Sequence, residues 1–159
     1  MTTPLYEMVI SYMDEADRHY QVNAEGGLIV AEITGDHGSW HTFIQVTDED
    51  EERKVVIHAL LPVRISDCNR LNVAELLTKI NYDLIVGNFE LGFENGEVLF
   101  KTTLDLADGQ ITQAMFERMY NLNTLTMNEH YGQILSAGYA GGDHAISTAE
   151  NLPEGVMLQ

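Results

Sequence analysis

Residues 69–105 constrain the fold of this chain more than any other stretch. Asn72 and Glu75 have the spacing of a helix-capping box. The apolar residues that follow recur with the period of an amphipathic helix: Val73, Leu76, Leu77, Ile80 and Leu84. Gly87 ends this pattern, and residues 88–94 then form a strand that turns back at Asn95-Gly96, a dipeptide suited to a type I′ turn. We therefore expect a helix and a β-hairpin that bury each other's apolar faces.

The turn also predicts how the two hairpin strands pair. With Glu94 paired to Glu97, the register separates apolar from charged side chains, because neighbouring residues of a strand point to opposite faces. Glu90 then falls opposite Lys101 on the charged face. The apolar face carries Phe89, Leu91, Phe93, Val98, Phe100 and Leu104.

A helix and an antiparallel meander are expected before this segment. The helix covers residues 4–17, with Thr3 as its N-cap, and the strands cover residues 28–33, 39–47 and 53–61. The acidic turn pairs Thr47 with Glu52, so that His41 lies opposite His58. One face then carries Trp40, Thr42, Ile44, Val46, Arg53, Val55, Ile57 and Ala59, and the mixed face carries His41, Phe43, Gln45, Lys54, Val56 and His58.

A long helical pattern runs from Ile111 to Leu135 after the hairpin. Its middle is rich in poor helix formers, so we expect a kink or a break near Asn123. The elements together predict an α+β fold in which an antiparallel sheet of about five strands packs with helices in the order α-βββ-α-ββ-α. We expect one domain over residues 1–146 and a loosely ordered tail over residues 147–159.

Composition excludes several classes of partner. The chain has 25 acidic and 8 basic side chains, a formal charge of -17, which repels phosphate backbones and anionic lipids. We therefore expect neither nucleic acid nor a membrane as partner, and the charge favours either solubility alone or a basic or amphipathic polypeptide. Cys68 is the only cysteine, so no internal disulfide is possible; we expect a small buried thiol in a cytoplasmic protein.

No catalytic or cofactor-binding motif is present, so we predict no cofactor and no enzyme activity. The best metal candidates are the residues that could surround the His pair: Asp36, His37, His41 and His58. Their spacing matches no zinc motif, which favours solvated or interface histidines over a metal site.

Residues of the central segment resemble the YbjN-domain family, whose fold is similar to that of bacterial type III secretion chaperones. The resemblance is carried in order by Arg70, Leu76-Leu77, Ile80-Asn81 and Gly87-Asn88-Phe89-Glu90-Leu91, and it extends over about residues 5–146. It implies a bacterial homodimer that holds another polypeptide, with a suggested role in regulating sensory transduction, and it supplies no catalytic residues.

Two functions therefore stay open. The first is a non-catalytic protein-binding module, chaperone-like or regulatory, whose interface candidates are Phe43, Val56, Leu60 and Leu99. The alternative is a small metal-dependent enzyme that uses the His/Asp cluster.

Overall fold

An antiparallel sheet of six strands, in the order β1-β2-β3-β4-β7-β6, forms the centre of the computed structural model, which describes residues 4–23, 27–49, 52–140 and 146–148. The described helices are α1 (Leu5–Glu15), α2 (Asp67–Asp83) and α3 (Gln113–Gly138). The sheet strands are β1 (Gln21–Val22), β2 (Ile29–Thr34), β3 (Ser39–Glu49), β4 (Glu52–Leu60), β6 (Asn88–Leu91) and β7 (Val98–Asp105). A separate two-stranded sheet joins β5 (Val63–Ile65) to β8 (Ile146–Thr148).

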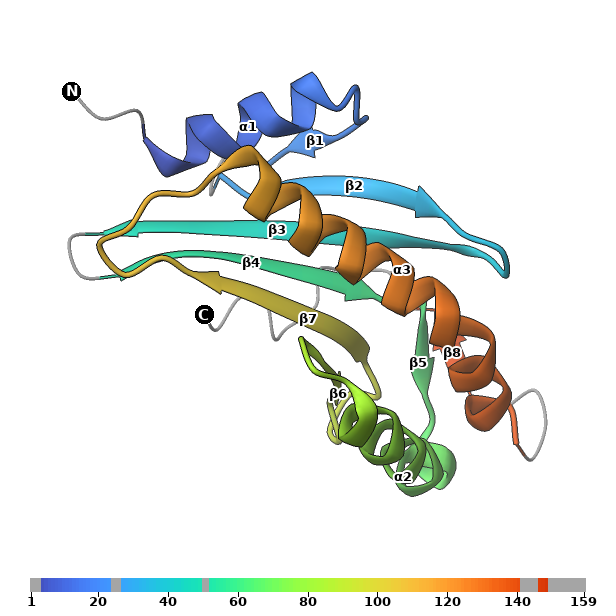
Figure 1. Ribbon diagram of the computed structural model, residues 1–159. Helices are drawn as coiled ribbons and strands as arrows, with labels where there is room; N and C mark the ends of the chain where they lie inside the picture. The colour runs from blue at the N-terminus through green and yellow to red at the C-terminus, as the bar shows by residue number, and fades with distance from the viewer. Residues whose placement is uncertain (1–3, 24–26, 50–51, 141–145, 149–159) are drawn as a thin grey trace.

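The helices cover one face of the large sheet. Figure 1 shows α3 crossing the strands diagonally, with α1 beside its first turns and α2 near the end of the sheet that carries β6. One core cluster lies under α2 and the second half of α3, around Trp40, Phe100 and Met127. The other lies between α1 and the first half of α3, around Ile44 and Phe116. The predicted α+β fold and order of the main elements are confirmed, and β1, β5 and β8 are additional short strands.

The predicted faces of the meander are confirmed, but its register is wrong by two residues. Glu49 pairs with Glu52, so His41 lies opposite Leu60 and not opposite His58. The strand continues through Asp48 because its carboxylate has structural partners: it accepts hydrogen bonds from the Leu5 amide and from Arg53, both at 2.8 Å. The bond from the Leu5 amide, at the first turn of α1, holds the pKa of Asp48 below its usual value.

The hairpin register is also wrong by two residues. Phe89 pairs with Phe100 and the ladder ends at Leu91, so residues 92–97 form a longer loop than the expected type I′ turn. A contact with β5 stabilises this loop, because the Ile65 backbone amide donates a hydrogen bond to the Gly96 carbonyl at 2.8 Å. Phe93 is therefore in the loop and 53% exposed. Because both shifts are even numbers, every strand residue keeps its predicted face.

The predicted capping box of Asn72 and Glu75 is wrong, because α2 begins at Asp67, five residues before Asn72. Ser66 is the N-cap, Asn72 lies inside the helix, and Glu75 pairs with Lys79 at 2.8 Å. The polar first turn misled the prediction because the buried Asn69 serves a tertiary contact, in which its side-chain amide donates to the Gly138 carbonyl at the end of α3. The apolar stripe of α2 is confirmed, with Val73, Leu77 and Ile80 buried.

The expected break in the last helix is wrong, because α3 is continuous through Asn123. This side chain is buried, and its Nδ2 lies 3.0 Å from the Ile57 carbonyl oxygen and 3.3 Å from that of Phe100. A residue with poor helix propensity is therefore retained here because it joins α3 to β4 and β7.

Some of the remaining predictions concern residues outside those that the structure describes. Thr3, the expected N-cap of the first helix, is one such residue, but that prediction is wrong because Pro4 occupies the N-cap position of α1. The tail over residues 149–159 also lies outside the described residues, whereas Ser147 and Thr148 belong to β8. Within the described ranges, no helix is both long and apolar enough to cross a membrane.

Replacing the Asn123 amide tests its role in placing α3. Asn123→Ala is expected to lower the free energy of unfolding by about 1 to 3 kcal/mol, because hydrogen bonds are lost inside the core. Urea titration followed by circular dichroism measures this change. Asn121→Ala on the exposed side of α3 is the matched control and should change stability by about 0.5 kcal/mol or less; equal effects would contradict the role of Asn123.

The hairpin face makes a second stability prediction. Phe89→Ala is expected to cost about 3 to 5 kcal/mol because its buried ring packs on Phe100, with 4.7 Å between the ring centroids. Glu90→Ala, which removes a carboxylate from the opposite face, should cost about 1 kcal/mol or less. Chemical denaturation of both variants measures the difference, and similar small losses would show that the apolar face is not buried as described.

Candidate functional site

The four predicted metal candidates are not brought together. Asp36 lies in the β2–β3 turn and exchanges two 2.8 Å hydrogen bonds with Asn128 of α3, while His37 packs near Gly132. His41 is exposed on the sheet face turned away from the helices, which we call the back face. Among the described residues, no group of three or more His, Cys, Asp or Glu side chains is arranged to hold a metal ion. The described residues therefore assemble no site for the metal-dependent alternative.

His58 is fully buried in β4, between Phe43 of β3 and Lys101 of β7. Among the residues that the structure describes, neither ring nitrogen has a hydrogen-bond partner, so the neutral imidazole is favoured. Burial lowers the pKa of His58 to about 4; the charge of Lys101 acts in the same direction and that of Glu90 opposes it. The ring is therefore a neutral core group at pH 7.

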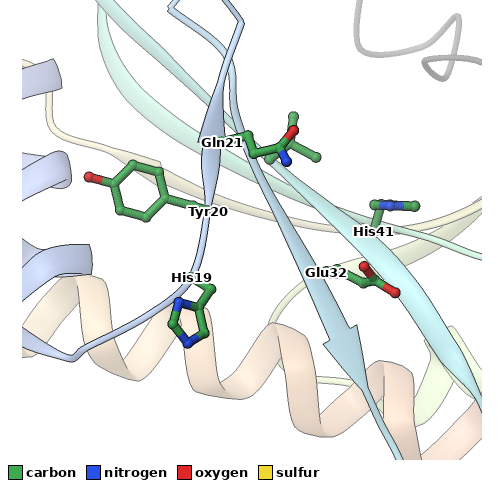
Figure 2. A pocket seen from close by; sticks show the side chains of 6 residues that line it. His19, Tyr20, Gln21, Glu32 and His41 are labelled. Carbon is green, nitrogen blue, oxygen red and sulfur yellow. The ribbon is translucent and has the colours of Figure 1, made fainter.

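A polar cavity of about 260 Å³ lies at the β1 edge of the sheet. Figure 2 shows its side chains on the segment leading into β1 and on β2 and β3, where Glu32 and His41 occupy paired positions on neighbouring strands. Tyr20 points towards α1, where its hydroxyl donates to Asp14 at 2.7 Å. His19, Glu32 and His41 are all exposed, and within the described residues none of them has a hydrogen-bond partner that would orient it for acid–base chemistry.

The four predicted interface residues do lie together, on the back face of β3, β4 and β7. They are only 3–6% exposed: Phe43, Val56, Leu60 and Leu99. These side chains are closed to a partner in this conformation, and their role as an interface stays a prediction.

The most exposed apolar side chains occur elsewhere, at the end of α2. Ile85 is 98% exposed and Tyr82 is 90% exposed, an unusual arrangement for large apolar residues that stand close together in the sequence. Beside them, an open groove of about 250 Å³ lies between residue 86, β7 and the first half of α3. We call it the α3 groove; its lining is Val86, Leu104, Met115, Arg118, Met119 and Leu122.

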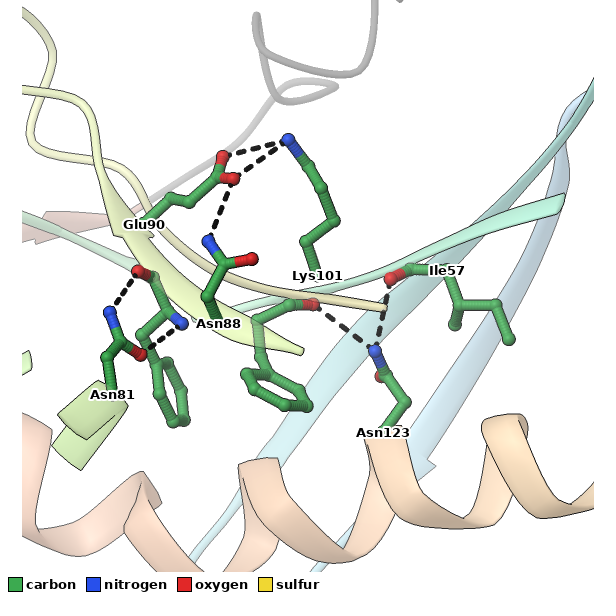
Figure 3. A network of polar contacts seen from close by, with 8 residues as sticks. Ile57, Asn81, Asn88, Glu90, Lys101 and Asn123 are labelled. Carbon is green, nitrogen blue, oxygen red and sulfur yellow. Dashed lines mark hydrogen bonds and ion pairs between the residues drawn. The ribbon is translucent and has the colours of Figure 1, made fainter. Parts of the chain in front are cut away.

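The loop over residues 84–87 has a fixed conformation. Gly87 has a φ of +77°, and a Cβ atom there would lie 2.6 Å from the Phe100 ring, so only glycine fits. Strand β6 follows Gly87 directly, and the side chain of Asn81 in α2 binds its edge. The Asn81 amide accepts a hydrogen bond from the Phe89 backbone amide at 2.7 Å and donates one to the Phe89 carbonyl at 2.9 Å. Figure 3 shows this clamp beside the ion pair of Glu90 with Lys101. Ile85 is thus displayed by an anchored turn.

Sequence reasoning missed this site because exposure is a tertiary property. The available signal was the run Leu84-Ile85-Val86, since three consecutive apolar residues cannot all enter the buried stripe of one helix. The prediction for Cys68 was also wrong, because the thiol is exposed near the N-terminus of α2.

Buried His58 predicts a pH dependence of stability. Its pKa is lower in the folded state than the unfolded value of 6.5, so the unfolded chain binds the proton first and stability is lost as pH falls from about 6.5 to about 4. The expected contribution is about 3 kcal/mol over this window, from 1.36 kcal/mol per pKa unit. Denaturant titrations of the wild type and of His58→Leu at pH 7 and pH 4.5 measure it; an equal loss in both would contradict the shift.

Comparison with known proteins finds a matching family model and similar solved structures. The family model named YbjN, described as "Putative bacterial sensory transduction regulator", matches residues 5–135. The solved structure titled "Crystal structure of YbjN, a putative transcription regulator from E. coli" is similar with a TM-score of 0.61 and 10% sequence identity, over 94% of this chain and 99% of that one. At this identity the likeness shows the fold alone. No curated protein matches the chain.

Proposed function

The chain belongs to the YbjN family, and from this premise we propose that it is a non-catalytic regulatory protein that acts by binding another polypeptide. The family description names a regulator, and the predicted metal candidates form no common site among the described residues. A regulator without chemistry of its own must act through binding.

The exposed loop at residues 84–87 carries this proposal. Ile85 is almost fully exposed although the surrounding backbone is anchored by Gly87 and by the bonds of Asn81 to Phe89. Exposing apolar area is unfavourable by roughly 25 cal/mol per Å², so a large apolar residue held rigidly in solvent favours a surface that a partner covers.

Charge narrows the kind of partner. With a formal charge of -17, the chain is repelled by DNA and RNA, which favours regulation through protein contacts over direct contact with nucleic acid. A basic or amphipathic polypeptide fits both the acidity and the apolar loop. The chaperone-like mode, the homodimer implied by the family resemblance, and the back-face interface at Phe43, Val56, Leu60 and Leu99 stay predictions. We place the function in the cytoplasm, in agreement with a free Cys68 thiol.

Affinity capture from a lysate of the source organism tests the proposal. The wild type should retain a stoichiometric second polypeptide, and Ile85→Asp should lose at least about nine-tenths of it, because a charge would be buried in the apolar contact. Val22→Asp is the matched control, since Val22 is also exposed but lies on β1 at the opposite edge of the sheet. Intact-mass analysis of the eluate identifies the polypeptide.

Two results would count against the proposal. One is the absence of any stoichiometric polypeptide with the wild type. The other is equal retention by the wild type and Ile85→Asp, which would exclude the loop as the contact. Circular dichroism of each variant shows whether it is folded.

A further inference from the structure

We propose that the α3 groove binds an apolar peptide segment that also carries a carboxylate, and that Arg118 pairs with this carboxylate. This inference rests on the proposed function, because it specifies the polypeptide that the apolar loop would contact. The partner is a different protein from this chain.

The dimensions of the groove suit peptide side chains. About 250 Å³ is below the usual 300 to 1,000 Å³ of pockets that bury a drug-sized ligand, so the groove accommodates one or two apolar side chains. It is open to solvent, since Val86 and Met115 are each 38% exposed. Met115 and Met119 have flexible thioether side chains that adapt to different apolar surfaces. Val86 belongs to the same loop as Ile85, so one extended segment can contact both.

Arg118 is distinguished from the other basic residues because it forms no ion pair with any described carboxylate of the chain. Seven of the eight Lys and Arg residues form ion pairs with carboxylates of this chain. The seven are Arg18, Arg53, Lys54, Arg64, Arg70, Lys79 and Lys101. Within the part of the chain that the structure describes, Arg118 is exposed and has no such partner.

The neighbouring carboxylate cannot serve Arg118 without breaking another contact. Glu117 points to the other side of α3, where it accepts two hydrogen bonds from Arg18 at 2.7 Å and 2.5 Å. In a chain with 25 acidic residues, a guanidinium left unpaired beside an apolar groove is complementary to an anionic group from outside. Arginine binds carboxylates with a planar pair of donors, and Asp and Glu are the residues of a peptide that supply this group.

The net negative charge of the chain and the positive charge of Arg118 together determine which peptide segment binds. A partner that is basic overall is attracted by the charge of -17, and a single Asp or Glu among apolar residues would then fix its position at Arg118. The segment therefore has apolar side chains for the groove and the loop, with one acidic residue between or beside them.

Peptide display tests this inference directly. A random library of 12-residue peptides is selected on the full wild-type chain, and the enriched sequences are compared with those selected on Arg118→Glu. The wild type should enrich Asp or Glu next to Leu, Ile, Phe or Met. Arg118→Glu should lose this acidic preference and select Lys or Arg at the same place, because the charge at the rim has been reversed.

A synthesised peptide from the wild-type selection gives the size of the effect. Its dissociation constant should rise about tenfold with Arg118→Gln, as expected for the loss of one charged hydrogen-bonded pair. It should rise less with Arg118→Lys, which keeps the positive charge but loses the planar pair of donors. Met115→Asp should weaken binding at least as much, because it places a charge in the groove. Each substituted residue is exposed, so the variants should keep the fold.

Four outcomes would overturn the inference. Enriched peptides without an acidic residue would remove the role of Arg118, and binding that is unchanged by Met115→Asp would remove the groove. Self-association that Met115→Asp abolishes would show that a second copy fills the groove. Peptides that depend on Ile85 but ignore both Arg118 and Met115 would overturn this inference and leave the proposed function standing, whereas the capture experiment with Ile85→Asp decides that function separately.

Discussion

The buried amide of Asn123 fixes α3 on the sheet, and the other features of the helix-covered face depend on that position. The Asn123 side chain donates hydrogen bonds to backbone carbonyls of β4 and β7, and these bonds set the rotation of α3 about its axis and its distance from the sheet. With α3 placed in this way, Phe116 and Met127 enter the two core clusters on either side of Asn123. The same placement turns Met115 and Arg118 towards β7 and residue 86, so the α3 groove is a consequence of this contact.

A second pair of contacts fixes the loop beside the groove. The Asn81 side chain hydrogen-bonds both backbone polar groups of Phe89, as a neighbouring strand would, and Gly87 allows the backbone to approach the Phe100 ring closely. The loop over residues 84–87 is therefore positioned by buried neighbours although Ile85 itself contacts almost nothing. An anchored backbone with an exposed apolar side chain loses little conformational entropy on binding, which suits a docking surface.

The sequence predicted which residues share a face and failed on how far each strand extends. Because successive side chains of a strand point to opposite faces of the sheet, Ile44 and Phe43 must lie on different faces, and a register shift of two residues does not change this assignment. The registers themselves depend on Asp48 binding the first turn of α1 and on Ile65 binding the hairpin loop, and such contacts between distant segments leave no local pattern. Asn69 and Asn123 misled the helix predictions for the same reason, because their polar side chains serve tertiary hydrogen bonds. Likewise, the exposure of Ile85 does not follow from composition or periodicity, and neither does the absence of an ion-pair partner for Arg118 among the described residues.

The central claim is that residues 84–87 and the first half of α3 form the surface that a polypeptide partner covers. Hydrogen–deuterium exchange of the chain, alone and with the captured partner bound, tests it most directly. We expect slower exchange at residues 84–87 and at the α3 residues beside the groove, with β3 and β4 unchanged. Protection confined to the back-face strands around Phe43 and Leu60, with none at Ile85, would contradict it.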